Sequence, residues 1–348
     1  MLTSPAAVAP VRSEGSQAVA HRARRRALAT LVALAALVLV VLASLALGVR
    51  DIAPVEVWRA LTAPVDGLMD HDVVLDQRLP RTVVGLVAGV ALGCAGTVIQ
   101  GVTRNPIADP GLLGLNSGAS LAVVCAVWLF GITSPIGYVW FAFLGAAAAA
   151  AIVFSVGRGQ PVRLALVGAA VTALITPLIT LVLLRDQQAF NLYRFWSVGS
   201  LTGRGLDTVA WLWPFAVVGV VLAAVLAHRL NMLALGDDVA TALGQRVGTT
   251  RALASVAIVL LAGTATSLAG PVALVGLVVP HAARRLVGTD YRWIMGIGAL
   301  LGPVMLLTAD VLGRLVLPRS ELEAGVVAAL LGAPVLVAVA RSRTVAGA

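Results

Sequence analysis

The fold is decided by residues 78–118, RLPRTVVGLVAGVALGCAGTVIQGVTRNPIADPGLLGLNSG. Arg78 and Arg81 flank a Leu-Pro pair, and a glycine-rich apolar run follows them. Asn105-Pro106 ends that run, and Asp109-Pro110-Gly111 turns the chain into a second apolar run. Proline and Asx residues fix tight turns, so the stretch predicts two membrane helices joined by a short, rigid, polar turn. Such a turn places specific groups at a membrane face, which indicates a transport pathway and not a simple anchor.

The composition predicts an all-α polytopic membrane protein. The 348 residues are 59% hydrophobic and 12% charged, with a mean hydropathy of +0.98. Soluble domains carry about 25% charged residues, so a soluble globular protein is excluded. All 25 basic residues are arginine. They are scattered between apolar runs and form no continuous basic face, so we expect no nucleic-acid partner.

The absence of lysine removes two kinds of chemistry. A P-loop needs its lysine to reach nucleotide phosphates, and a Schiff-base enzyme needs a lysine amine. If ATP drives transport, another polypeptide must therefore bind that ATP. The sequence also contains no HExxH or GxSxG motif and no clustered acids within its spans. We expect no catalytic residues and no enzyme activity.

We expect no metal site, cofactor or disulfide framework. The two cysteines fall inside apolar runs, and the four histidines stand singly without metal-ligand spacing. These residues are Cys94, Cys125, His21, His71, His228 and His281.

The N-terminal region divides at a run of arginines. Residues 1–26 are polar and end in HRARRR, which predicts a disordered cytoplasmic tail. The following 22 residues, 27–48, carry no charge. That run is too long for a signal-peptide core and fits a span of about 20 residues. We expect residues 27–342 to form one transmembrane domain that begins with an uncleaved helix.

Ten apolar runs predict ten transmembrane helices. Gly270-Pro271 leaves open whether the two runs around it are separated by a turn or by a kink. The runs lie near residues 27–48, 82–101, 112–131, 138–157, 164–184, 209–227, 252–270, 272–287, 294–313 and 324–340.

The distribution of charge predicts that both termini are cytoplasmic. With ten spans, the segments on the side of the N-terminus hold 16 arginines and five acids. The segments on the other side hold the remaining 9 arginines and 11 acids. Short loops rich in arginine stay in the cytoplasm, so an even number of spans with both ends inside fits this asymmetry.

The loop 235–251, LGDDVATALGQRVGTTR, is predicted to form a short helix on the cytoplasmic side. Asp237 or Asp238 can cap this helix, and Gly244 can end it. Its apolar positions are Val239, Ala242 and Leu243. On these residues alone, an ordinary loop element and a docking surface for a soluble partner are equally good interpretations.

Asp310 and Arg314 lie one helical turn apart in an apolar run. A carboxylate within a membrane span raises the possibility of proton coupling. An arginine four residues away can instead neutralise it, because side chains at i and i+4 meet on one helix face. We favour the ion pair and keep proton coupling as the alternative.

Several motifs together resemble the FecCD/BtuC-type permease family, the membrane subunits of ABC importers for iron–siderophore, haem and vitamin B12. The resemblance covers about residues 30–342. One departure is Leu322-Glu323-Ala324-Gly325, where the family usually has a proline before the Val-Gly or Ile-Gly pair. The motifs that carry the resemblance are LPRT at 79–82, Gln100 with NPIADPGLLGLNSGA at 105–119, WSVGS at 196–200, LGDDVATALG at 235–244, GLVVPHAARRLVGTD at 276–290 and GVVAALLGAP at 325–334.

The resemblance implies a BtuC-like fold of ten helices, paired with a second copy or with a paralogous permease in the cytoplasmic membrane. It implies two further partners, a cytoplasmic ATPase dimer and an extracytoplasmic substrate-binding protein. Ferric siderophores are the expected cargo, with vitamin B12 or haem as alternatives. A secondary transporter coupled to ions through Asp310 is the rival class.

The resemblance also assigns roles to residues at both faces. The residues that would contact the ATPase are Leu235, Gly236, Asp237, Asp238, Ala242, Leu243 and Gly244. The residues that would receive carboxylates of the binding protein are Arg78, Arg81 and Arg314. The residues that would close the pathway at the cytoplasmic side are Asn105, Pro106 and Ile107.

The sequence near Arg78 and Arg81 leaves two interpretations. Pro80 is expected to hold the residue before it extended, so that both arginines point away from the membrane and are free to bind carboxylates. Alternatively, they pair with the outer-loop acids, which are Asp66, Asp70, Asp72 and Asp76.

Overall fold

The computed structural model describes residues 12–157, 160–317 and 320–341. Within these ranges the chain forms helices and turns and no strand. Ten of the helices coincide with the ten predicted spans. They are α1 (Arg12–Ala46), α4 (Leu79–Thr103), α5 (Leu115–Phe130), α6 (Pro135–Gly157), α7 (Pro161–Arg185), α9 (Leu206–Leu233), α11 (Val247–Ala269), α12 (Val275–Val287), α13 (Tyr291–Val316) and α14 (Ala324–Arg341).

Most of these helices are long and apolar enough to cross a membrane. Among the described residues, seven helices meet that requirement by length and composition, and α5 and α14 are shorter apolar helices. Helix α12 has only 13 residues, or about 20 Å at 1.5 Å per residue. The non-helical residues 270–274 precede it, so Gly270-Pro271 marks a turn and not a kink. Val272 in this segment is buried, as expected for irregular backbone at membrane depth.

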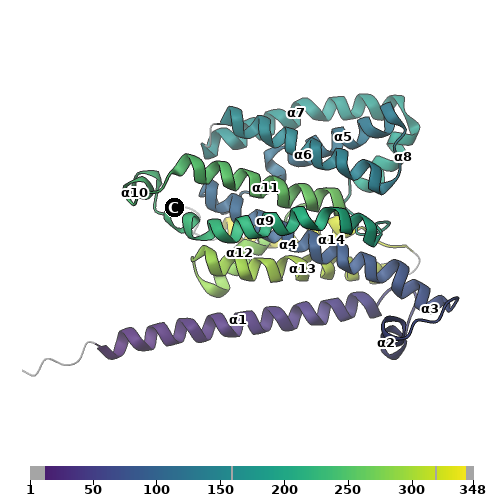
Figure 1. Cartoon of the computed structure of the whole chain (residues 1–348), viewed down its shortest axis with the longest axis horizontal. Coiled ribbons are helices and arrows are strands. Elements are labelled where there is room, and N and C mark those ends of the chain that lie inside the picture. The colour runs from purple at the N-terminus through teal and green to yellow at the C-terminus, as the bar shows by residue number, and fades with distance from the viewer. Residues whose placement is uncertain (1–11, 158–159, 318–319, 342–348) are drawn as a thin grey trace, which may run out of the picture.

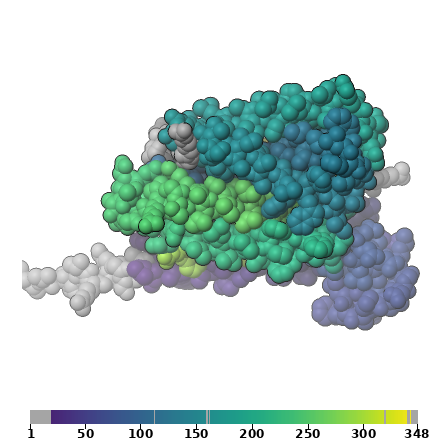
Figure 2. Space-filling model, turned by 45° about the horizontal axis from the view of Figure 1, so that its top comes forward, coloured from purple at the N-terminus to yellow at the C-terminus, as the bar shows by residue number. Residues whose placement is uncertain are grey.

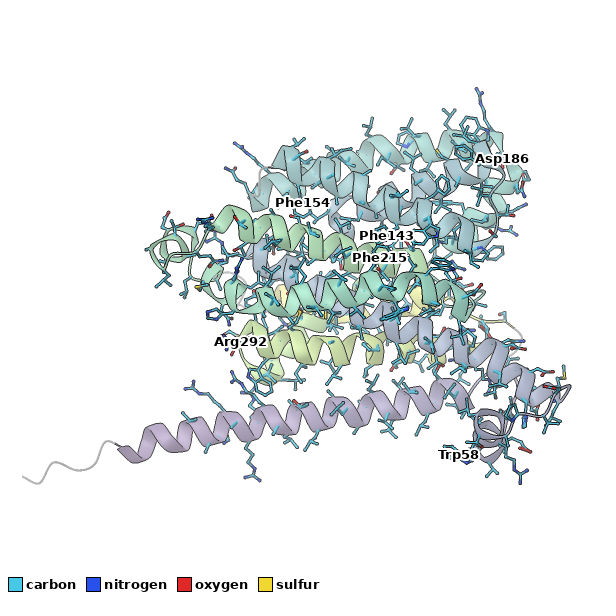
Figure 3. All side chains as sticks on the ribbon, in the orientation of Figure 1. Trp58, Phe143, Phe154, Asp186, Phe215 and Arg292 are labelled. Atoms are coloured by element: carbon cyan, nitrogen blue, oxygen red, sulfur yellow. The ribbon has the colours of Figure 1, made fainter. Side chains whose placement is uncertain are left out.

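Short helices lie at the two ends of the bundle. They are α2 (Pro54–Thr62), α3 (Met69–Asp72), the π-helix η1 (Val73–Arg78), the 3₁₀-helix η2 (Pro110–Leu113), α8 (Gln187–Trp196) and α10 (Asp237–Ala242). Helices α2 and α3 project as a lobe from one end, and α10 lies at the opposite end (Figures 1 and 2). Trp58 on α2 points outward from this lobe (Figure 3) and is exposed.

The predicted disordered tail is partly wrong. Helix α1 begins at Arg12, so residues 12–26 continue the first span as helix beyond the body of the bundle (Figure 1). Residues 1–11 lie outside the described part of the chain. Alanine and arginine, which dominate residues 18–27, are among the strongest helix formers, and a helix already nucleated by the adjoining span extends at little cost.

Helix α4 is the centre of the fold. It packs against α9, α11, α12 and α13, while α5, α6 and α7 form a layer that joins this group through α6 and α11. Phe143 on α6 and Phe215 on α9 meet between the two groups with ring centroids 5.0 Å apart (Figure 3). Helix α1 lies along the other side, mainly against α13 (Figure 1).

Glycines bring the backbone of α4 into contact with its neighbours. A Cβ atom added at Gly89 would lie 2.4 Å from the Cα of Pro303, and one added at Gly96 would lie 1.9 Å from the carbonyl oxygen of Gly276. Small residues allow this close approach, which in lipid replaces the missing hydrophobic driving force between helices. The glycine spacing of the second span therefore packs α4 against α12 and α13.

We predict that Gly96→Ala destabilises the fold by about 1–3 kcal/mol, the usual cost of overpacking, because the carbonyl of Gly276 leaves no space for a methyl group. Thermal unfolding of the detergent-purified chain measures this change. Gly296→Ala on α13 is the matched control, since a Cβ there meets no atom within 4 Å. Alanine in a helix is favoured over glycine by about 0.5–1 kcal/mol, so the control should be neutral or stabilising. Equal midpoints for the two variants would contradict the prediction.

Candidate functional site

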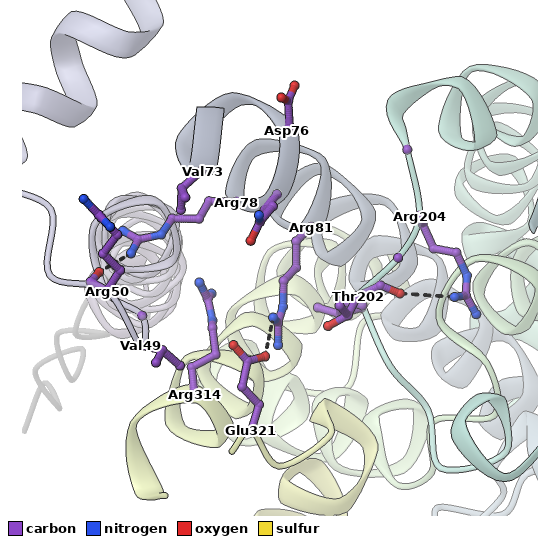
Figure 4. Close-up of a pocket in the computed structure, with 15 residues that line it drawn as sticks. Val49, Arg50, Val73, Asp76, Arg78, Arg81, Thr202, Arg204, Arg314 and Glu321 are labelled. Carbon is purple, nitrogen blue, oxygen red and sulfur yellow. Dashed lines mark hydrogen bonds and ion pairs between the residues drawn. The ribbon is translucent and has the colours of Figure 1, made fainter. Parts of the chain in front are cut away.

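A cavity of about 530 Å³ opens at the end of the bundle that carries α2 and α3. Five arginines contribute to its wall, together with the acids Asp76 and Glu321. The arginines are Arg50, Arg78, Arg81, Arg204 and Arg314 (Figure 4). The structure therefore brings together the three arginines that the sequence predicted as a docking site, although they lie on η1, α4 and α13.

Asp310 is the common partner of two of these arginines. It is fully buried. Its Oδ1 lies 2.7 Å from Nη2 of Arg81, and its Oδ2 lies 2.8 Å from Nη2 of Arg314. The predicted pair between Asp310 and Arg314 is thus confirmed, and Arg81 is a second cation that the sequence did not reveal. Arg81 also binds Glu321, whose Oε2 lies 2.6 Å from Nη1 (Figure 4).

Arg78 and Arg314 together cap the C-terminal end of α1. Arg78 donates to the carbonyl oxygens of Leu45 at 2.9 Å and Ala46 at 2.6 Å. Arg314 donates to the carbonyl oxygen of Ser44 at 2.9 Å. The last carbonyls of a helix have no partner within it and carry partial negative charge, so guanidinium groups stabilise this end. The cavity wall is therefore also a structural joint between α1, α4 and α13.

Two expectations for Arg78 and Arg81 are wrong, namely the extended conformation before Pro80 and the pairing with the outer-loop acids, whereas their role in docking stays a prediction. Pro80 lies in the first turn of α4, where it costs no hydrogen bond, and Leu79 before it is helical. The exposed fractions of Arg78, Arg81 and Arg314 are 5%, 8% and 4%. The outer-loop acids do not hold them either: within the described residues, Asp70 pairs with Arg50 at 2.6 Å. Arg78 ends η1, Arg81 lies in the first turn of α4, and both side chains are buried in the protein.

At the opposite end, residues 104–114 form the rigid turn that the sequence predicted. The side chain of Asn105 accepts a hydrogen bond from the amide of Ile107 at 3.0 Å. The side chain of Asp109 accepts one from the amide of Gly111 at 2.8 Å and so caps η2. Burial raises the pKa of Asp109 to about 6. Asn105 and Ile107 are exposed at the tip of this turn.

Helix α10 presents an apolar surface to solvent. Leu235, Val239 and Leu243 are 62%, 46% and 60% exposed. Ala242 is also exposed, and Ala240 is the residue that α10 buries. The expected cap by Asp237 or Asp238 is wrong: Gly236 occupies the N-cap, and both aspartates lie in the first turn, where they suit the helix dipole. An exposed apolar surface of this kind favours the docking interpretation of the loop.

Gln100 on α4, which belongs to one of the family-like motifs, forms a polar junction. Its Nε2 donates to the carbonyl oxygen of Leu277 at 3.2 Å and to that of Ala108 at 3.4 Å. Nη1 of Arg284 donates to its Oε1 at 2.7 Å. Gln100 therefore joins the turn 104–114 to α12. A glutamine within an apolar span is itself a signal of such a junction.

These features define a multi-pass membrane transport protein with one charged joint at each end of its bundle. A sequence profile of the FecCD transport family matches residues 36–342. The chain belongs to this family.

Known proteins similar to the chain include two permeases and one solved structure. The ferric enterobactin transport system permease protein FepD of Escherichia coli (strain K12) is 44% identical over 93% of this chain and 98% of its own length. The probable siderophore transport system permease protein YfiZ of Bacillus subtilis (strain 168) is 38% identical over 82% of this chain and 87% of its own. An inward-facing structure described as a metal-chelate type ABC transporter matches with a TM-score of 0.79 and 25% identity, over 89% of this chain and 98% of that one.

We predict that Asp310→Asn lowers the free energy of unfolding by about 3–5 kcal/mol, because it leaves Arg81 and Arg314 buried without their common anion. Thermal or denaturant unfolding of the purified chain measures the loss. Arg59→Gln is the control, because the pair between Arg59 and Glu56 is exposed and pairs of that kind contribute about 0–1 kcal/mol. A loss for Asp310→Asn no larger than for the control would show that Asp310 does not hold this joint together.

Proposed function

We propose that the chain is the permease subunit of an ATP-binding-cassette importer that moves ferric siderophores inward across the cytoplasmic membrane. The observation that carries the proposal is the family match over residues 36–342. The siderophore assignment is supported by the ferric enterobactin permease, which is 44% identical to nearly the whole chain. Because the chain has no lysine for a P-loop, a partner subunit supplies ATP hydrolysis.

The rival, an ion-coupled secondary transporter, needs Asp310 to gain and lose a proton. Asp310 lies between the guanidinium groups of Arg81 and Arg314. Protonation would therefore leave the buried Arg314 without a carboxylate and Arg81 with Glu321 alone, which is costly. The geometry supports a structural role for this carboxylate and so favours the importer.

The proposed arrangement gives each end of the bundle one partner. The ATPase dimer docks on the α10 end in the cytoplasm, where both termini also lie. The binding protein docks at the arginine-lined cavity of the other end. The permease pairs with a second copy or a paralogue, and the turn carrying Asn105, Pro106 and Ile107 closes the pathway toward the cytoplasm.

The burial of Arg78, Arg81 and Arg314 changes how docking would work. Their guanidinium groups already have partners, so a carboxylate of the binding protein must replace one of those partners. Glu321 is the replaceable one, because its side chain is 35% exposed while Asp310 is fully buried. We propose that the incoming carboxylate takes the place of Glu321 at Arg81, where a planar guanidinium suits a carboxylate.

We expect proteoliposomes that contain the permease and its ATPase to take up labelled ferric siderophore when binding protein and ATP are supplied. Collapsing the proton gradient should leave the rate unchanged. Parallel assays with cobalamin and haem test the cargo. Uptake that needs the proton gradient and not the ATPase would refute the importer, and preferential uptake of cobalamin or haem would refute the siderophore assignment alone.

We predict that Asp238→Arg combined with Leu243→Glu abolishes ATPase binding and uptake while the purified permease stays folded. Both side chains are exposed on or beside α10, so the change alters the docking surface and not the core. Co-purification with the ATPase and thermal unfolding measure the two effects. Normal co-purification and transport by the double variant would mean that this loop is not the ATPase contact.

We predict that Glu321→Gln tightens binding of the binding protein by up to about fivefold, because it removes the carboxylate that competes for Arg81. That factor corresponds to about 1 kcal/mol, the upper value for a solvent-accessible ion pair. The gain should shrink with salt, because the Debye length falls from about 10 Å at 0.1 M to about 3 Å at 1 M. Glu323→Gln is the control, a neighbouring acid with the same change of charge. A misfolded variant cannot mimic a gain in affinity, and unchanged or weaker binding by Glu321→Gln would count against docking at Arg81.

A further inference from the structure

Asp237 links α10 to two other helices. Its Oδ1 lies 3.5 Å from Nη2 of Arg104 at the end of α4, and its Oδ2 lies 3.0 Å from Nη2 of Arg251 on α11. The two pairs differ in character. Arg251 is shielded, with 15% of its side chain exposed, whereas 40% of the Arg104 side chain is exposed. The pair with Arg251 therefore anchors α10, and the longer pair with Arg104 is the one that breaks easily.

The backbone conformation of Arg104 is independent evidence that its side chain has a functional role. Arg104 has φ 50° and ψ 31°, the left-handed conformation, at the C-cap of α4. Glycine or asparagine normally occupies such a position because other residues are strained there. Among the described residues, the only other non-glycine residue with positive φ is Leu274. An arginine held in this strained conformation is a reason to look for a role of its guanidinium group.

The turn that follows Arg104 is stiff, so a displacement of Arg104 can be transmitted to Ile107. The Asn105 side chain holds the amide of Ile107, and the carbonyl oxygen of Asn105 accepts a further bond from the amide of Ala108 at 3.2 Å. Pro106 adds a fixed φ within the same turn. A shift of Arg104 therefore moves Ile107 with it, and does not dissipate in a flexible loop.

The ion pair between Asp237 and Arg104 also connects α10 with the turn at residues 104–114. Helix α10 packs on α9 and α11. Among the hydrogen bonds and ion pairs of the described residues, Arg104–Asp237 is the one that joins α10 to residues 104–114. The Arg104 guanidinium group also lies close to the backbone of Gly236, the residue before α10. A Cβ atom added at Gly236 would lie 3.7 Å from Nη1 of Arg104.

We propose that Asp237 is a positioning residue that transmits movement of α10 to the cytoplasmic turn through its ion pair with Arg104. This proposal rests on the function proposed above, in which an ATPase moves α10. Exposed ion pairs contribute little to stability, so the pair is suited to re-form between states and its loss should leave the fold intact. Allosteric coupling needs a contact whose strength differs between two states, and the proposal assigns that role to this pair when α10 moves.

The test uses the complete importer with its ATPase and binding protein in proteoliposomes. Cys94 and Cys125 are replaced by alanine, and Ile107→Cys reports the turn through its rate of alkylation by a water-soluble maleimide, with and without a non-hydrolysable ATP analogue. This background is compared with Arg104→Gln, with Asp237→Asn and with the double variant. Arg104→Gln is the cleanest change, because it leaves the pair between Asp237 and Arg251 in place.

We expect the nucleotide to change the alkylation rate in the background, and each single variant to lose most of that change. The double variant should lose no more than either single variant, since both remove the same contact. Uptake per ATP hydrolysed should fall by about fivefold or more, the lower range of typical allosteric coupling. In Arg104→Gln, ATPase co-purification and the thermal midpoint should stay within error, because the pair between Asp237 and Arg251 is kept. Arg163→Gln, an exposed arginine at the start of α7, should behave as the background.

Three results would overturn the proposal. A normal nucleotide response in Arg104→Gln would refute the link alone, provided that uptake remains ATP-dependent. Losses that add in the double variant would show that the two residues act separately. A background that takes up substrate without any nucleotide response at position 107 would refute the link together with the cytoplasmic gate, and a permease that binds no ATPase would refute the proposed function itself.

Discussion

The close approach of α4 to α12 and α13 is the constraint on which the rest of the structure depends. Gly89 and Gly96 allow backbone-to-backbone contact at distances that no side chain could share. In lipid, apolar surface gives helices little reason to associate, so packing of this density is the main source of a unique arrangement. Because α4 lies at the centre, its position determines where Arg81 emerges at one end and where Arg104 ends the helix at the other.

Ion pairs and hydrogen bonds of buried arginines join the helices in addition to the glycine packing. Asp310 receives Arg81 and Arg314 from two helices, and Arg78 and Arg314 satisfy the last carbonyls of α1. A cation buried at a membrane boundary needs partners, and here each guanidinium group finds a carboxylate, helix carbonyls or both. The same arginines line a cavity open to solvent. The same side chains therefore support the fold and form part of a surface open to solvent, on which Glu321 is more exposed than Asp310.

The two ends of the bundle hold different kinds of polar contact. The cluster of Asp310, Arg81 and Arg314 is buried and strongly paired. The opposite end combines a stiff turn, a short helix with exposed leucines and a weak, exposed ion pair between them. Local rearrangement costs the least free energy where contacts are weak and exposed. Gln100 connects this end to the rigid centre through Arg284 and the carbonyl oxygens of α12 and the turn.

Four features were predictable from the residues alone: the ten helices, the rigid turn at 105–111, the loop helix near 237 and the pair between Asp310 and Arg314. Each of these depends on residues within one or two helical turns of each other, where hydrophobic period, turn chemistry and i,i+4 spacing act. Local rules failed at Leu79, which is helical because Pro80 lies in the first turn of α4, and for residues 12–26, where the adjoining span propagated its helix. Three contacts required the packed helices to be known: Arg81 binds Asp310 and Glu321, Arg78 caps α1, and Asp237 meets Arg104. These partners are far apart along the chain, and helix packing alone selects which of the many acids and carbonyls each arginine reaches.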